Sequence, residues 1–313
     1  MRDNWGRRGG LALSAMLLSV AVAWPQTGGK APDTKTGGTP GGADSPAWFK
    51  VQTVAEGVWR IFDDHGAGNA YVVTGKDKAL LIDTGTGAAD LATCVRSITR
   101  LPMMVVNTHG HSDHAGGDFQ FEAASAHPDA FEVIVRSAGR EGHADRIQRV
   151  LAESPALEPL LLKAGGDFDQ KRLVPVRGGH IFDLGARRLE VIETPGHTGG
   201  DLCLLDAEHK LLFAGDTVNA PTWLFKPYSL PLDVYLETLQ RLRQRAGEYE
   251  TILTGHGDPL DRTFIDEQIA CAESILSGAC KGEPYPKRYG NALACSYKRS
   301  QIAFDPERLR AKH

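Results

Sequence analysis

Three histidines and one aspartate fall within six residues of the sequence, in the order His-x-His-x-Asp-His. They are His109, His111, Asp113 and His114. Zn²⁺ and Fe²⁺ both accept imidazole and carboxylate ligands, and alternate positions on a curled loop can face two neighbouring ions. A single histidine is more often packed or solvated than a ligand, but four such groups together make chance clustering a poor explanation. The stretch therefore predicts a metal site.

The segments around this cluster indicate how its side chains are positioned. Residues 103–106 form a short apolar run that predicts a buried strand, so the cluster would lie on a loop at the strand's carboxyl end. His197 and His256 also follow strand-like runs, in turns bounded by glycine. Glycine lets the backbone approach closely where a bulkier residue would clash. These two histidines are therefore further candidate ligands.

Five stretches, in order, resemble motifs of the metallo-β-lactamase-fold hydrolase superfamily. The His-x-His-x-Asp-His loop resembles its metal-binding motif. The others are Leu80-Leu81-Ile82-Asp83-Thr84-Gly85, Thr194-Pro195-Gly196-His197-Thr198, Phe213-Ala214-Gly215-Asp216-Thr217 and Thr254-Gly255-His256-Gly257-Asp258. The resemblance covers roughly residues 48–276. It is closer to glyoxalase II-like and lactonase-like members than to true β-lactamases, because His114 is present and Gly215-Asp216-Thr217 contains no cysteine.

The resemblance implies a ligand set for two metal ions. One ion would be held by His109, His111 and His197, the other by Asp113, His114 and His256, with Asp216 bridging both. Two Zn²⁺ are expected, with iron or manganese as alternatives.

This ligand set predicts hydrolysis. A metal-bound hydroxide would attack the carbonyl of a small ester, lactone, thioester or amide, since metal binding lowers the pKa of water towards ~7. Asp113 is the candidate residue for passing a proton to the leaving group, with a metal-bound water as the alternative. The alternatives are a β-lactam hydrolase, a phosphodiesterase and an iron-dependent oxidoreductase similar to persulfide dioxygenases. A metal-binding module without activity is disfavoured, because no ligand needed for hydrolysis is missing.

Other residues are candidates for supporting roles. Asp83, at a predicted strand end, is expected to orient a ligating histidine, with a turn cap as the alternative. His65 and Asn69 lie in a glycine-rich loop and are candidate substrate contacts. Trp223 and Tyr228 belong to an aromatic run after Asp216 and are candidates for a pocket wall. Core packing explains these aromatic residues nearly as well.

The chain divides into three parts by composition. Residues 1–23 have a basic start, an apolar run and small residues at a cleavage position, which predicts a signal peptide. Residues 24–46, rich in Gly, Thr and Pro, predict a flexible linker. Residues 47–313 are expected to form one hydrolase domain with a C-terminal extension. We therefore expect an exported protein, periplasmic or secreted, without stable membrane insertion after cleavage.

The composition also bears on partners. A formal net charge of −4 and the lack of a large basic run argue against nucleic acid, so a small-molecule substrate is expected. Nothing in the sequence specifies an oligomeric state. Five cysteines leave at least one unpaired within a monomer; one disulfide among Cys271, Cys280 and Cys295 is expected, with buried free thiols as the alternative.

Strand-like and helical patterns alternate twice along the domain, and candidate ligands follow strand ends each time. The pattern suits two sheets packed between helical layers, with a site at the rim. The resemblance implies the same α/β fold, a four-layer αββα sandwich. Residues 131–135 are predicted as a short strand, 144–163 as a helix interrupted at Pro155 and Pro159, and 265–277 as the last helix.

Overall fold

The computed structural model describes residues 48–162, 165–286 and 290–312. The predicted signal peptide and the whole predicted linker, residues 24–46, lie outside the described residues. No helix in the described ranges has the length and apolar character needed to span a bilayer.

Two large sheets form the centre of the fold. The first has seven strands in sequence order: β1 (Lys50–Ala55), β2 (Val58–Phe62), β3 (Ala70–Thr74), β4 (Ala79–Ile82), β5 (Met103–Val106), β6 (Ala124–Ala126) and β7 (Leu173–Pro175). The second has six, in the spatial order β14 (Leu260–Asp261), β13 (Thr251–Thr254), β11 (Leu211–Gly215), β10 (Leu202–Asp206), β9 (Arg188–Glu193) and β8 (Ile181–Asp183).

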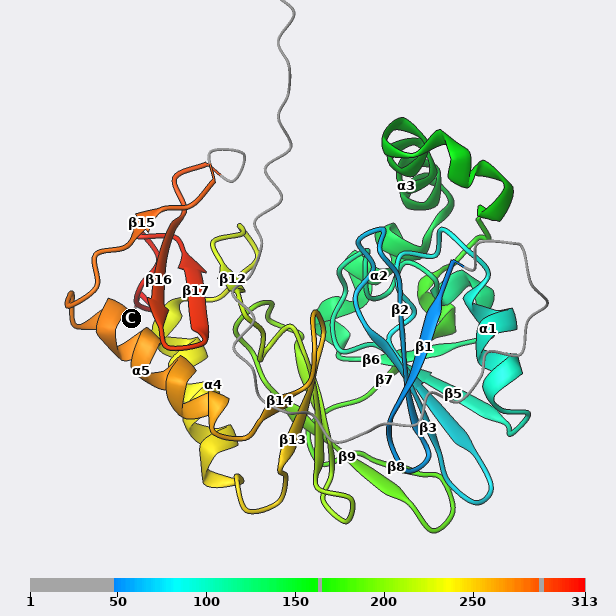
Figure 1. Ribbon diagram of the computed structural model, residues 1–313, viewed down its shortest axis with the longest axis horizontal. Helices are drawn as coiled ribbons and strands as arrows, with labels where there is room; N and C mark the ends of the chain where they lie inside the picture. The colour runs from blue at the N-terminus through cyan, green and yellow to red at the C-terminus, as the bar shows by residue number, and fades with distance from the viewer. Residues whose placement is uncertain (1–47, 163–164, 287–289, 313) are drawn as a thin grey trace, which may run out of the picture. The chain divides into compact units, whose positions relative to one another are not determined.

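Helices cover the outer faces of both sheets (Figure 1). Helices α1 (Leu91–Ile98) and α2 (Phe131–Ala138) cover the first, and α4 (Leu232–Gln244) and α5 (Phe264–Leu276) cover the second. Helix α3 (Arg140–Glu153) instead packs against α2. Four short 3₁₀ helices complete the set: η1 (Asp118–Gln120), η2 (Pro128–Ala130), η3 (Pro155–Leu160) and η4 (Gln170–Arg172).

Alternation of side chains along buried strands produces the layers. In β3, Tyr71 and Val73 pack between the two sheets, whereas Ala70 and Val72 face the layer that contains α1 and α2. Successive strand residues point to opposite faces, so a strand that is apolar throughout can serve two cores. The other face of the second sheet packs against α4 and α5. The predicted four-layer αββα fold is confirmed.

A third sheet was not predicted. It contains β12 (Thr222–Leu224), β17 (Ser300–Phe304), β16 (Leu293–Tyr297) and β15 (Glu283–Pro284), in that spatial order. It packs on the core that α4 and α5 share with the second sheet. Its strand β12 lies shortly after Asp216, so the C-terminal residues are tied directly to the candidate site.

Two local predictions differ from the structure. Residues 131–135 belong to helix α2, because Pro128 starts a helical turn and Ala130, Ile134 and Ala138 place one buried face at helical spacing. Their β-branched character was the weaker signal. The predicted helix over 144–163 begins earlier and ends at Glu153, because Pro155 cannot continue it.

The expected disulfide joins Cys280 and Cys295, fifteen residues apart, while Cys271 is a buried free thiol.

Replacing both bonded cysteines by alanine is expected to lower the free energy of unfolding by about 3 kcal/mol, since the cross-link restricts the unfolded chain. Denaturant unfolding would measure this, with Cys94→Ala, a free and partly exposed thiol, as the control. Equal loss of stability in the control would contradict the prediction.

Candidate metal centre

The seven predicted ligands come together because their loops share one edge of the sandwich. In the first sheet, β4 and β5 are parallel, so the loops carrying Asp83 and the His-x-His-x-Asp-His cluster leave at the same end. In the second sheet, β11 and β13 are parallel, and β9 runs in their direction because β10 is antiparallel to both β9 and β11. The ligands that follow these three strands, His197, Asp216 and His256, therefore meet the first sheet's loops.

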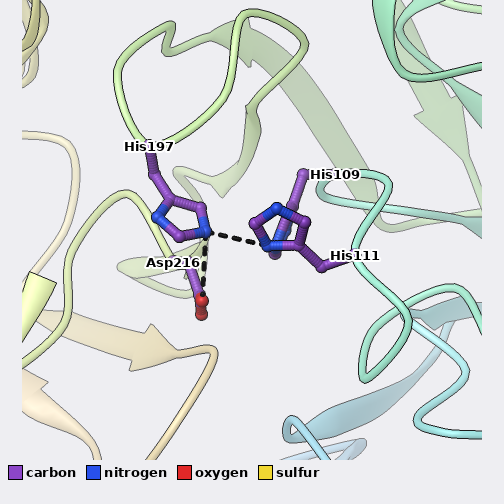
Figure 2. A group of neighbouring side chains, drawn as sticks. All are labelled: His109, His111, His197 and Asp216. Carbon is purple, nitrogen blue, oxygen red and sulfur yellow. Dashed lines mark hydrogen bonds and ion pairs between the residues drawn. The ribbon is translucent and has the colours of Figure 1, made fainter. Parts of the chain in front are cut away.

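One group consists of His109, His111, His197 and Asp216, whose donor atoms converge (Figure 2). His111 Nδ1 lies 2.9 Å from His109 Nε2 and 3.0 Å from His197 Nε2. His197 Nε2 is also 3.5 Å from Asp216 Oδ2. Three ring nitrogens and a carboxylate oxygen thus face a common point from three different loops.

The second group consists of Asp113, His114 and His256. His114 Nε2 and His256 Nε2 are 3.2 Å apart, and His256 Nε2 lies 3.3 Å from Asp113 Oδ2. Asp216 Oδ1 lies 3.4 Å from His114 Nε2 and 3.6 Å from His256 Nε2. The two oxygens of Asp216 therefore face different groups.

Electrostatics within the cluster hold the carboxylates ionised. Burial would raise the pKa of Asp216, but His256, His114 and His197 hold it well below its usual value. Burial likewise opposes ionisation of Asp113, yet His114 and His256 lower its pKa to about 2. The carboxyl groups of Asp216 and Asp113 are therefore both anionic at neutral pH, as metal ligation requires.

The histidines divide into two kinds. Burial and neighbouring imidazoles lower the pKa of His109 well below its usual value and that of His111 to about 3, so both are neutral. Burial opposes charge on His114, but Asp216, Asp113 and Asp83 raise its pKa well above the usual value. A cation bound beside the carboxylates would replace the proton on His114.

Hydrogen bonds to the far ring nitrogen orient three of the histidines. His114 Nδ1 contacts Asp83 Oδ2 at 2.8 Å, His197 Nδ1 contacts the Trp223 carbonyl at 2.8 Å, and His109 Nδ1 contacts Thr108 Oγ1 at 3.1 Å. Each contact leaves Nε2 free to bind a metal. His111 differs, because its buried Nε2 has no hydrogen-bond partner within the described ranges.

Asp83 supports one histidine of each ligand group, His114 directly and His109 through Thr108. Besides His114, it accepts hydrogen bonds from the Thr108 N–H at 2.7 Å and the Thr108 hydroxyl at 2.8 Å, and that hydroxyl contacts His109. The contacts match the predicted orienting role better than a turn cap within its own loop.

Glycine allows the loops to approach closely. A Cβ at Gly255 would overlap Asp216 Oδ1, and a Cβ at Gly68 would fall 2.5 Å from the His114 ring. Both positions therefore require a residue without a side chain.

These features together fit a pair of divalent metal ions. Each group combines imidazole with carboxylate, and Asp216 is shared. This donor set suits Zn²⁺.

The four predicted substrate contacts lie in different surroundings. The Asn69 amide is buried and donates to the carbonyls of Thr254 and Gly257, so it supports the His256 loop rather than facing a substrate. His65 is exposed, and its ring packs on Trp48 with 4.5 Å between centroids. Trp223 acts on the site through its backbone carbonyl. Tyr228 is 45% exposed, and its ring lies 4.7 Å from that of His111, so it remains a candidate contact.

Sequence reasoning missed two supporting residues, Thr108 and Asn219. Thr108 precedes His109 directly, and a hydroxyl beside a ligand at a strand end could have suggested its role. Asn219 contacts Asp216 and the His256 backbone. It carries no motif that marks it.

Asp118 is a buried carboxyl behind the ligand loop. Its Oδ1 accepts from Thr84 Oγ1 and Asn107 Nδ2, while Oδ2 has no partner among the residues described. Burial raises the pKa of Asp118 to about 7, although these hydrogen bonds lower it. The folded protein thus holds a proton that the unfolded chain loses above pH ~4, so stability falls as pH rises from there to about 7.

Asp118→Asn removes this titration. The free energy of unfolding of the variant, minus that of the wild type, should therefore increase by on the order of 2 kcal/mol between pH 5 and pH 8. Denaturant unfolding at both pH values would measure this. A difference between the two proteins that is the same at both would contradict the assigned pKa.

Comparison with known proteins connects this geometry to one family. Residues 63–256 match the model of the metallo-beta-lactamase superfamily. The chain is 30% identical over 233 residues to the acyl-coenzyme A thioesterase MBLAC2 of Gallus gallus, covering 67% of this chain and 80% of that protein. It is 25% identical over 170 residues to a hydroxyacylglutathione hydrolase of Hyphomonas neptunium, covering 54% of each.

A solved structure supports the fold. A metallo-beta-lactamase from Pontibacter korlensis aligns over 72% of this chain and 99% of its own, with a TM-score of 0.52 and 20% identity.

Proposed function

Because this chain belongs to the metallo-beta-lactamase superfamily and is a metal-dependent hydrolase, we propose that it is a dinuclear zinc enzyme that hydrolyses a small acyl thioester. The observation that carries the proposal is the pair of ligand groups joined by Asp216. His109, His111 and His197 would hold one ion, and Asp113, His114 and His256 the other. The bound ions would supply a nucleophile derived from water at neutral pH and polarise the substrate carbonyl.

Two relatives support the thioester class. The name of one specifies acyl-coenzyme A, and that of the other hydroxyacylglutathione. Coenzyme A and glutathione are both thiols, so each name describes removal of an acyl group from a thiol carrier. A small-molecule substrate is therefore proposed for this chain as well.

The charge of Asp113 favours the same class. A carboxyl with a pKa of about 2 is a poor proton donor at neutral pH. An amide or alkoxide leaving group needs a proton, whereas a thiolate leaves readily because a thiol has a pKa near ~8.5. We therefore propose a different role for Asp113 from the one predicted: as a carboxylate it would bind metal and accept hydrogen bonds, rather than protonate the leaving group.

Tyr228 would contact the substrate at the rim of the site. Burial and the nearby Asp113 and Asp216 raise the pKa of its hydroxyl to about 12, so it stays protonated. A neutral phenol half-exposed beside His111 can donate a hydrogen bond to the acyl group.

A hydrolysis panel tests the proposal. The zinc-loaded full chain would be assayed on acyl-coenzyme A, acylglutathione, aryl ester, lactone, β-lactam and phosphodiester substrates, with thiol or acid release as the signal. The highest kcat/KM on thioesters is expected. Turnover of phosphodiesters or β-lactams alone would overturn the thioester class. Oxygen uptake by iron-loaded protein, with no hydrolysis, would move the chain to the oxidoreductase alternative.

We also propose that the protein is exported, to the periplasm or beyond the cell. The signal-peptide pattern of residues 1–23 supports this, and so does the Cys280–Cys295 disulfide, because such bonds persist in oxidising compartments. Cell fractionation would test it, and retention of the full-length chain in the cytosol would refute it.

A further inference from the structure

A buried amide lies between the two ligand groups. Asn219 is 4% exposed, and its Nδ2 donates to Asp216 Oδ1 at 2.7 Å. Its Oδ1 accepts from the backbone N–H of His256 at 3.2 Å. One side chain therefore contacts the shared aspartate and the loop that carries a ligand of the second group.

The bonded oxygen of Asp216 is the one that faces the second group. Oδ1 lies 3.4 Å from His114 Nε2 and 3.6 Å from His256 Nε2, whereas Oδ2 lies 3.5 Å from His197 Nε2. The final torsion of an aspartate is broad and poorly defined by itself. A hydrogen bond to Oδ1 fixes this torsion, and with it which oxygen faces which group.

Contacts from strand β12 and helix α5 hold Asn219 itself in place. Its backbone carbonyl accepts hydrogen bonds from Thr222 Oγ1 at 2.9 Å and from Gln268 Nε2 at 3.1 Å. Gln268 is a fully buried residue of α5, and its Nε2 also contacts Thr222 Oγ1 at 2.8 Å. A polar chain of contacts thus runs from α5 to the centre, within an otherwise apolar core.

We infer that Asn219 is a positioning residue that aligns Asp216 and His256 for the second metal ion, so that losing its amide weakens that site selectively. The inference rests on the proposed function, because it takes Asp216 and His256 as metal ligands. The first group keeps its three histidines when Asn219 is changed, since none of their described contacts involves this amide.

The first experiment measures zinc stoichiometry and affinity by competition with a chromophoric chelator. The wild type should bind two zinc ions. In Asn219→Ala, affinity for the second should fall about 10- to 100-fold, the usual effect of removing an outer hydrogen bond from a ligand, while the first changes little. Gln120→Ala is a matched control, because that side-chain amide bonds the backbone of Ala92 and Ala89 and contacts none of the ligands in the part described.

Asn219→Asp separates positioning from general support of the fold. The variant keeps nearly the same volume and the acceptor for His256, but as a carboxylate it cannot donate to Asp216. With the donor to Asp216 lost but the volume and the acceptor for His256 kept, its affinity for the second zinc ion should fall as in Asn219→Ala, while the first site changes little. A role limited to supporting the fold would leave the second-site affinity of this variant near that of the wild type.

The outcomes are distinct. A wild type that binds fewer than two zinc ions overturns the dinuclear function, and the inference with it. A wild type with two ions and Asn219 variants with unchanged affinities at both sites overturns the inference alone. Equal weakening of both sites also overturns it, because selectivity is lost.

Discussion

Asp216→Ala is expected to lower kcat/KM by at least about a thousandfold, the largest effect of any single substitution in this chain. Asp216 is the only side chain whose oxygens face both ligand groups among the described residues, with Oδ2 near His197 and Oδ1 near His114 and His256. Metal ions contribute several kcal/mol to stabilising transition-state charge, and ~4 kcal/mol corresponds to roughly three powers of ten in rate.

Steady-state kinetics on the best substrate of the panel would measure this loss, together with metal content. Asp258→Ala is the matched control, because Asp258 lies two residues after His256 yet is exposed and pairs with Arg60 at 3.0 Å. The control should stay within about threefold, because the Asp258 carboxylate is exposed and the buried Arg60 keeps its hydrogen bond to the Gly257 carbonyl. Comparable activity in Asp216→Ala and the wild type would rule out a shared carboxylate ligand.

Much of the candidate site could be predicted from the sequence because its residues follow buried strands. The runs before His109 and His256 are short and mostly apolar, the run before His197 alternates polar and apolar residues, and each is followed by a turn with glycine. The order of strands in a sheet decides which turns share an edge, and that depends on pairing between segments far apart in the chain. The resemblance to the superfamily, and not the local sequence, indicated which turns share an edge.

Two residues that the sequence analysis named have contacts it did not predict, through a backbone group or across the fold. Trp223 orients His197 with its carbonyl, which any residue at that position could supply in principle. Asn69 was assigned to substrate contact, but it is buried against the Thr254 and Gly257 carbonyls of another strand end. Neither contact has a local pattern, because each depends on where two sheets meet.

In helix α2, by contrast, a local strand propensity was present, but the packing of the helix outweighed it. Residues 131–135 include Phe, Val and Ile, which favour strands. Burial of Ile134 and Ala138 on one face and the proline at the preceding turn determined a helix instead. Tertiary packing commonly overrides such propensities, since they amount to about 1 kcal/mol.

Removing the metal ions with a chelator should abolish hydrolysis and lower the free energy of unfolding by about 4 kcal/mol for each ion, the value for free zinc near a thousand times its dissociation constant. The physical reason is that ligands from four loops converge only in the folded chain, so the ions bind the folded state alone. Denaturant unfolding with and without chelator measures the difference. Equal stability in both conditions would contradict binding at this cluster.

The stabilisation by metal should also grow as pH rises. Without metal, burial lowers the pKa values of His109 and His111, so their contribution to stability is complete above pH ~6.5 and declines as pH falls from that value towards the lowered pKa of the folded protein. His114 and His256 behave oppositely: although loss of hydration opposes their charge, Asp216 and Asp113 raise both pKa values. Their contribution is complete below pH ~6.5 and is lost as pH rises through the folded pKa.

The metal-free protein therefore loses the His114 and His256 contribution above neutral pH, whereas the loaded protein does not, because cations replace those protons. At lower pH, the protons on His114 and His256 compete with the metal more strongly, so loading stabilises less. We expect the gap in free energy of unfolding between loaded and metal-free protein to be larger at pH 8 than at pH 6. A gap that is constant or narrows with rising pH would show that metal does not displace protons from these two histidines.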